Sequence, residues 1–289
     1  MVRGIISVII ASVLFGITPL GNKYVLLSGM SEECVLVWQA FVQIVGTGLC
    51  RLFSAQKSRI PGKDILRLLL IGGAFLGGTD YLLNSAYGYL PVSIVIMLHF
   101  IYPVIVLLIS VLFLHKKLSK VMLLTMGLSL LGLVLITDFA GGITLKGVLF
   151  ALGSALAYAL FIVTSDTESI RQYSLLQKLY YFSWGAFIVY GIKILLSGSF
   201  SMPADGKTAI ILIGVVGIGS LLGFYFITAG VRRIGAGKTA LLNMLEPITG
   251  VIGGVLVYHE VIGMRGAAGC VCVILAVLAF SLESVKTSR

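Results

Sequence analysis

The sequence predicts an all-α membrane protein of ten transmembrane helices, arranged as two inverted five-helix repeats. Three observations support this fold class. The 289 residues are 58% hydrophobic and 11% charged, with a mean hydropathy of +1.09, which excludes an ordinary soluble domain. Long apolar stretches recur along the whole chain, separated by short polar segments. The two halves of the chain also align with each other at a nearly constant spacing.

A helix needs about 20 apolar residues to cross the hydrocarbon core of a bilayer. The first apolar stretch follows Arg3 and resembles a signal peptide, but it continues without a small-residue cleavage site and is predicted to be a span. In chain order the predicted spans are residues 4–27, 34–53, 65–87, 91–114, 121–137, 147–165, 175–196, 208–231, 236–258 and 263–282.

The distribution of Lys and Arg predicts the orientation of these spans. Cytoplasmic loops of membrane proteins carry an excess of both residues. With both termini cytoplasmic, sixteen of the 21 Lys and Arg residues lie inside, and five remain outside: Lys23, Lys146, Lys193, Lys207 and Arg265. Topology thus accounts for the net charge of +10, so nucleic acid is not an expected partner. The expected location is the cell (inner) membrane, as a multi-pass protein.

The repeat is visible as matching residues. A shift of 143 residues aligns Gly4 with Gly147. A shift of 144 aligns Leu90 with Ile234, Pro103 with Pro247, His115 with His259, Gly73 with Gly217 and Tyr81 with Tyr225. Residues 1–142 and 143–289 are therefore predicted to be two repeats within one membrane domain. Five spans is an odd number, so the repeats enter the membrane from opposite sides, an arrangement typical of alternating-access transporters.

The ninth span carries Asn243, Glu246 and Pro247 about halfway along its length. An ionisable group at that depth costs roughly 2.5–3.5 kcal/mol on insertion scales, so it usually faces a partner or a water-filled cavity. Proline removes a backbone donor and bends a helix. We expect Glu246 to face a transport pathway, and Pro103 and Pro247 to act as hinges. The alternative for Glu246 is a structural pair with His99 or a helix hydrogen bond.

Helical spacing and the repeat extend this site to other spans. The repeat aligns His99 with Asn243 and Tyr102 with Glu246. Glu246 and Asp80 are the candidates for proton coupling. A backbone-capping role for Asp80, a structural role for His99 and simple packing for the aromatic residues remain open alternatives. The predicted substrate-binding residues are Glu246, Asn243, His99, Tyr102, Asp80, Asn84, Tyr81, Trp184, Tyr158, Tyr225 and Gln39.

The residue types suggest how such a site works and what it is not. A desolvated carboxyl holds either a proton or a cationic group, and aromatic faces attract ammonium groups. No cofactor or metal is expected, because the three histidines lack zinc-ligand spacing and the four cysteines form no CxxC pair. An enzyme is not expected either, since a lipid-modifying membrane enzyme places its catalytic groups near an interface rather than at mid-membrane.

The motif LEP-x8-LVYHE from Leu245 to Glu260, the small-residue starts of both halves and the ten spans resemble EamA-type transporters of the drug/metabolite transporter superfamily. The resemblance implies carriage of small metabolites such as amino acids, amines or nucleosides, commonly with proton coupling and more often as export. In the first half Lys116 stands where this pattern has a glutamate, so a role for Glu260 is implied in one half only.

The expected function is therefore a secondary active transporter of a small cationic or zwitterionic amine or amino acid, working by proton-coupled alternating access in the lipid bilayer. An uncoupled facilitator of neutral or aromatic amino acids is the alternative, and an integral-membrane lipid-modifying enzyme is a remote one.

Overall fold

All secondary-structure elements of the computed structural model are helices over the residues it describes, which are 1–53, 59–90, 92–113, 115, 118–137, 144–165, 167–259 and 263–286. Within these residues nine helical segments are long and apolar enough to cross a membrane, and Lys120–Ile136 is apolar but shorter. The fold is that of a multi-pass membrane protein. The predicted repeat boundary, Lys116 and Glu260 lie outside the described residues.

The first half contains five helical segments, two of which are interrupted. A π-helix interrupts the third, and a non-helical turn interrupts the fourth. Its elements are α1 (Val2–Leu27), α2 (Glu32–Leu52), α3 (Gly62–Leu70), η1 (Ile71–Gly77), α4 (Gly78–Tyr87), α5 (Val92–His99), α6 (Tyr102–Leu112) and α7 (Lys120–Ile136).

The second half repeats this pattern, with one extra short helix and a 3-10 turn at the second interruption. Helix starts recur at the predicted spacing, since α3 and α11 begin at Gly62 and Gly206. Its elements are α8 (Leu145–Thr164), α9 (Glu168–Arg171), α10 (Leu175–Ser197), α11 (Gly206–Ile211), η2 (Leu212–Ile218), α12 (Gly219–Ile234), α13 (Ala236–Leu242), η3 (Asn243–Leu245), α14 (Glu246–Tyr258) and α15 (Met264–Lys286).

The two predicted hinge prolines lie in the first turn of a new helix, Pro103 in α6 and Pro247 in α14. Proline lacks a backbone donor and its ring clashes with the preceding turn, so the regular helix ends just before it. The first turn of a helix tolerates proline because the N–H groups there have no intrahelical partner. The helices are therefore broken before the prolines rather than bent at them.

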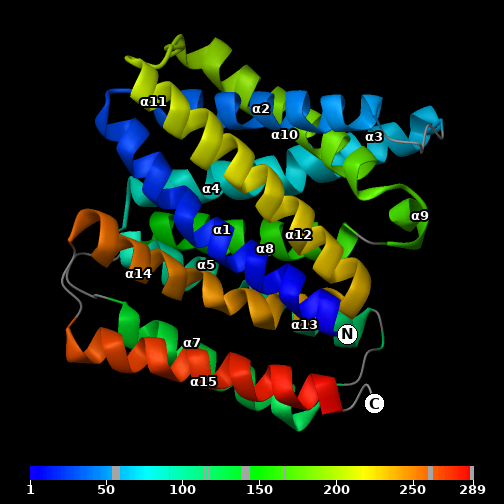
Figure 1. The fold of residues 1–289 in the computed structure, drawn as a ribbon, viewed down its shortest axis with the longest axis vertical. Coiled ribbons are helices and arrows are strands. Elements are labelled where there is room, and N and C mark those ends of the chain that lie inside the picture. The colour runs from blue at the N-terminus through cyan, green and yellow to red at the C-terminus, as the bar shows by residue number, and fades with distance from the viewer. Residues whose placement is uncertain are drawn as a thin grey trace.

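Equivalent elements of the two halves exchange partners. Helix α1 packs along α12 and α14 of the second half, and α8 packs along α4, α5 and α6 of the first. Figure 1 shows α2 and α10 along one edge of the molecule and α7 and α15 along the opposite edge, with both chain ends at the same end of the bundle. The interrupted fourth spans and the first helices of both halves lie between these edges.

Glycine permits the closest helix crossings. A Cβ atom on Gly185 in α10 would lie 2.5 Å from the backbone nitrogen of Gly73 in η1. A Cβ atom on Gly132 in α7 would lie 2.7 Å from the carbonyl oxygen of Gly269 in α15. These crossings bring backbone against backbone, which is typical of small-residue packing in membranes.

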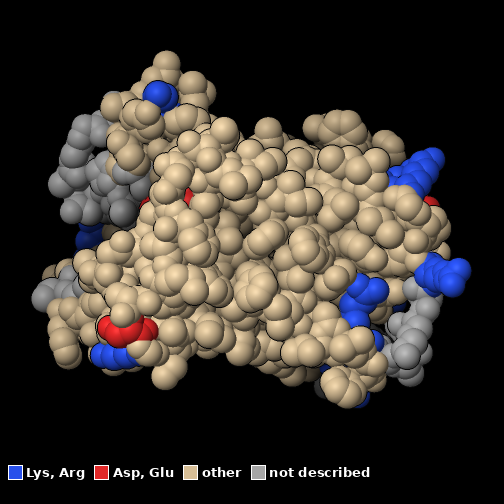
Figure 2. Space-filling model, turned by 90° about the horizontal axis from the view of Figure 1, so that it is seen from above, with Lys and Arg blue, Asp and Glu red and all other residues tan. Residues whose placement is uncertain are grey.

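Charged side chains on the face seen in Figure 2 lie mostly at two opposite ends, with a broad uncharged zone between them. The lysines predicted to be outside lie over tyrosine rings, as expected where amphipathic side chains meet a membrane surface. The distances from Nζ to the ring centroid are 4.2–4.9 Å for Lys23 over Tyr258, Lys146 over Tyr89, Lys193 over Tyr81 and Lys207 over Tyr24.

Candidate functional site

Asn243 is fully buried in η3, the 3-10 turn between α13 and α14. Its Oδ1 accepts a hydrogen bond from Ser12 Oγ at 2.9 Å. Its Nδ2 donates to the Tyr102 hydroxyl at 3.0 Å and to Glu246 Oε2 at 2.9 Å. One amide therefore joins side chains from α1, α6 and α14, which come from both halves of the chain.

Glu246 is the first residue of α14 and is half-buried. An acid at a helix N-terminus is favoured by the helix dipole. Thr249, one turn later, donates its hydroxyl hydrogen bond to either the carbonyl oxygen of Glu246 at 2.8 Å or that of Ser12 at 2.9 Å. Among the described residues no Lys or Arg pairs with Glu246. The groups that stabilise a negative charge on its carboxyl are therefore the side-chain amide of Asn243 and the N-terminus of α14.

His99 occupies the position equivalent to Asn243 and makes the equivalent contact. Its Nδ1 lies 3.0 Å from Ser154 Oγ in α8, as Asn243 is bonded to Ser12 in α1. The Ser154 hydroxyl also lies 2.6 Å from the carbonyl oxygen of Ala151, as the Ser12 hydroxyl lies 3.0 Å from that of Val8. The same hydrogen bond between halves thus occurs twice.

Three aromatic rings complete what we call the central polar cluster, defined as Glu246, Asn243, Tyr102, His99 and Tyr158. Tyr102 and Tyr158 meet edge to face with ring centroids 4.7 Å apart. The His99 ring lies 5.5 Å from Tyr158 and 5.7 Å from Tyr102. These five predicted site residues are brought together by the fold.

Asp80 lies in the first turn of α4, directly after the π-helix η1, and is half-buried. The Tyr190 hydroxyl of α10 donates a hydrogen bond to Asp80 Oδ2. Within the described structure this tyrosine is its hydrogen-bond partner, rather than the backbone around Gly77 or Gly78. Asp80 lies in α4, which packs along α8, the helix that carries Tyr158 of the central polar cluster.

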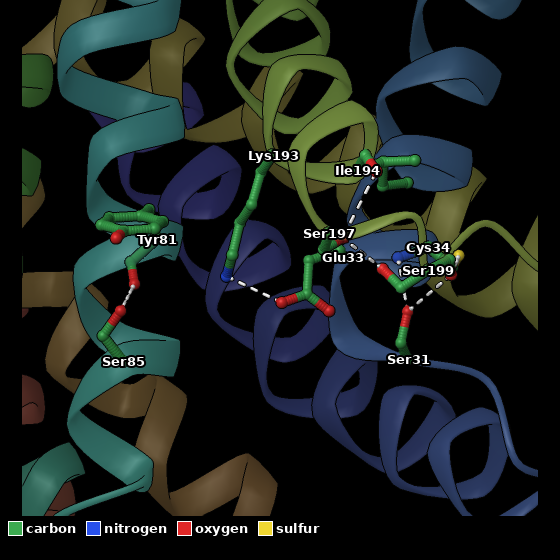
Figure 3. Close-up of polar contacts among 9 residues, drawn as sticks. All are labelled: Ser31, Glu33, Cys34, Tyr81, Ser85, Lys193, Ile194, Ser197 and Ser199. Carbon is green, nitrogen blue, oxygen red and sulfur yellow. Dashed lines mark hydrogen bonds and ion pairs between the residues drawn. The ribbon is translucent and has the colours of Figure 1, made fainter.

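Tyr81 and Asn84 lie farther along α4. Tyr81 is exposed, and its ring faces Lys193, whose Nζ also forms an ion pair with Glu33 Oε1 at 2.9 Å. Figure 3 shows this ion pair, Tyr81 and Ser85 at one end of the bundle. Asn84 is half-buried one turn beyond Asp80.

The remaining predicted residues, Trp184, Tyr225 and Gln39, lie in helices other than those that carry the central polar cluster. Trp184 is half-buried in α10 and packs edge to face with Phe187, with centroids 5.7 Å apart. Tyr225 is half-buried in α12 beside Phe226. Gln39 is buried in α2, which packs against α10 and η2.

Three residues that contact the candidate site were not predicted. Ser12 and Ser154 lie in the first helices of the two halves, and the alignment of Gly4 with Gly147 places them one residue out of register. That near match was a usable signal. For Tyr190 the sequence contains no such signal, because several aromatic residues lie along α10 and nothing distinguishes this one from the others.

Ser12→Ala is expected to lower the stability of the folded protein by about 1–3 kcal/mol, because it leaves the buried Asn243 Oδ1 without its donor. The matched control is Ser129→Ala in α7. Ser129 Oγ is also fully buried but has no hydrogen-bond partner in the described structure, so its removal should be neutral or stabilising. Thermal unfolding of the purified variants measures both, and equal melting temperatures would contradict the expectation.

Comparison with known proteins places this fold in a family. Residues 2–138 and 145–282 match the model of the EamA-like transporter family. No curated protein sequence matches the chain. A solved structure titled "Crystal structure of protein" superposes with a TM-score of 0.82 over 99% of this chain and 99% of that chain, at 16% identity, which shows the shared fold. Because the family model covers nearly all of both halves, the chain belongs to the EamA-like transporter family.

Proposed function

We propose that this chain is a secondary active transporter that moves a small cationic or zwitterionic amine or amino acid by proton-coupled alternating access. Family membership supports a membrane transporter with a small-molecule substrate rather than an enzyme. The finer proposal depends on the half-buried Glu246, which Asn243 holds in place and which no described Lys or Arg neutralises. Such a carboxyl takes up a proton or an ammonium group in competition, and this competition couples the two fluxes.

Alternating access is supported by the exchange of partners between the halves. The bond from Ser12 to Asn243 and the bond between Ser154 and His99 are equivalent, so the two first helices can swap roles. The breaks before Pro103 and Pro247 are the proposed hinges. In this proposal α7 is also a membrane span, which brings the total to ten, because its 17 residues extend about 26 Å and it packs along α15. Both termini are then cytoplasmic, and the protein resides in the inner membrane.

The test begins with thermal unfolding of the purified protein in the presence of amines, amino acids and nucleosides, because a ligand of the folded state raises the Tm. Flux of the best ligand is then measured in proteoliposomes with and without a proton gradient. Saturable flux driven by the gradient is expected. Flux that ignores the gradient favours the uncoupled facilitator, and turnover of phospholipid without solute flux favours the enzyme.

The ion pair between Lys193 and Glu33 gives a prediction about access from one end. It ties α10 to α2 beside Tyr81, and its side chains are 32% and 23% exposed. A pair of this exposure contributes about 0.2–1 kcal/mol. Glu33→Gln should therefore raise the labelling rate of a Ser85→Cys reporter in α4 by up to about fivefold.

Labelling is measured with a membrane-impermeant thiol reagent and corrected for the chain that lacks the reporter. The swapped pair Glu33→Lys with Lys193→Glu is the control and should return the rate to its original value. An unchanged rate in Glu33→Gln would mean that this contact does not hold the end closed.

A further inference from the structure

We infer that the preferred substrate is an organic dication, such as an alkanediamine, whose two ammonium groups bind Glu246 and Asp80 at opposite ends of one elongated site. This inference rests on the proposed transport function and narrows its substrate class.

Each of the two carboxyls has one oxygen in a hydrogen bond and one oxygen left over. Asn243 donates to Glu246 Oε2, and Tyr190 donates to Asp80 Oδ2. The second oxygens, Glu246 Oε1 and Asp80 Oδ1, make no hydrogen bond to any residue that the structure describes. They are not among its fully enclosed unpaired polar atoms either, so both keep accessible surface.

Helix packing and a chain of side-chain contacts link the two acids to Tyr158. Helices α4 and α8 run antiparallel, since Gly147 lies against Leu90 and Gly153 against Leu82. Continuing this register puts Asp80 opposite residues 155–156, less than one turn of α8 from Tyr158. On its other side the Tyr158 ring contacts Tyr102, which is hydrogen-bonded through Asn243 to Glu246.

Tyr158 itself points to a ligand. Its side chain is only 6% exposed, yet its hydroxyl makes no hydrogen bond within the described part of the chain. This hydroxyl is not among the fully enclosed unpaired polar atoms, so it keeps accessible surface and can bond to a ligand. Its ring also offers a face for a cation.

The charge balance selects a dication over other solutes. The described Lys and Arg residues in cation–π contacts lie at helix ends, such as Lys193, Arg51 and Lys146, and none pairs with Glu246 or Asp80. A zwitterion would bring its carboxylate into a site with two acids, where no described Lys or Arg pairs with either of them. A monoamine leaves one acid to be neutralised by a proton. A dication pairs with both, and its exchange for two protons moves no net charge.

The experiment compares α,ω-alkanediamines of increasing length with the matching n-alkylamines, by Tm shift and by competition for uptake in proteoliposomes. In the unmodified protein the best diamine should bind at least about tenfold more tightly than the alkylamine of equal length, as expected for one additional buried charge pair. Asp80→Asn should lower the affinity for the diamine to that for the alkylamine, whereas Glu246→Gln should weaken the binding of both.

Two further variants keep the test decisive. Asp80→Glu retains the charge on a longer side chain, so the preference should persist with its optimum at a shorter diamine. Asp64→Asn removes an acid that is already bound by Arg67 and Tyr173 at the end of α3, and it should change neither affinity. Diamines that bind no better than alkylamines, or amino acids that outcompete both, would overturn the dication inference while leaving the transport proposal intact. If no amine or amino acid binds and Glu246→Gln changes no flux, the transport proposal itself fails.

Discussion

Glu246→Gln is expected to reduce substrate transport by about a hundredfold or more and to abolish its response to a proton gradient. Glutamine keeps the shape of the side chain and can still accept the hydrogen bond from Asn243 Nδ2. It cannot carry the negative charge, and losing one partner of a buried ion pair costs about 3–5 kcal/mol. Initial rates in proteoliposomes, measured with and without the gradient, give both quantities.

The control for this variant is Glu168→Gln, which neutralises an exposed acid in the short helix α9. Its rate and its proton dependence should equal those of the unmodified protein. The melting temperature of Glu246→Gln separates a transport defect from a folding defect. If the variant transports at an unchanged rate with unchanged proton dependence, Glu246 is structural and the uncoupled facilitator becomes the better description.

Gly185→Ala is expected to lower the stability of the folded protein by about 3 kcal/mol or to prevent folding. The added Cβ would lie against the backbone of η1, close to the carbonyl oxygen of Leu69 and 2.5 Å from the nitrogen of Gly73. Backbone atoms cannot move aside as a flexible side chain can, so the two helices must separate and lose packing along their length. The Tm in detergent and the yield of monodisperse protein report this change.

Gly191→Ala in the same helix is the matched control. Within the part of the chain that the structure describes, no atom outside the helix lies within 4 Å of the Cβ position at Gly191. Alanine has the better helix propensity by about 1 kcal/mol, so this variant should melt at the same or a higher temperature. If Gly185→Ala melted as high as Gly191→Ala, the close crossing of α10 and η1 would be wrong.

Helix positions were predictable because the signal for them is local. A mostly apolar run long enough to cross a bilayer can be recognised from its own residues, and the predicted span 236–258 coincides with α13, η3 and α14 taken together. The repeat was visible for the same reason. Even a local backbone detail follows it, since the aligned residues His115 and His259 both have positive φ, at 49° and 54°.

The breaks within the spans were predicted only in part. Pro103 and Pro247 indicated an interruption near the middle of the fourth and ninth spans, but not that a helix ends before each proline and restarts with it. The π-helices η1 and η2 have no comparable marker in the sequence. They depend on how α10 and α2 press against glycine-rich segments of the third and eighth spans.

Chemical type and approximate depth were enough to single out Glu246, Asn243, His99 and Asp80, because a polar group in an apolar span is costly wherever it lies. Tyr102 was found through its alignment with Glu246. The partners of those groups depend on packing between distant segments. Serine and tyrosine cost little in a membrane helix, so nothing in the composition of α1, α8 or α10 marks Ser12, Ser154 or Tyr190 as neighbours of an acid. The contacts of Ser12 and Ser154 exist because each half packs its first helix against the other half, and that of Tyr190 because α10 packs against the third span. No single stretch of the chain contains these relations.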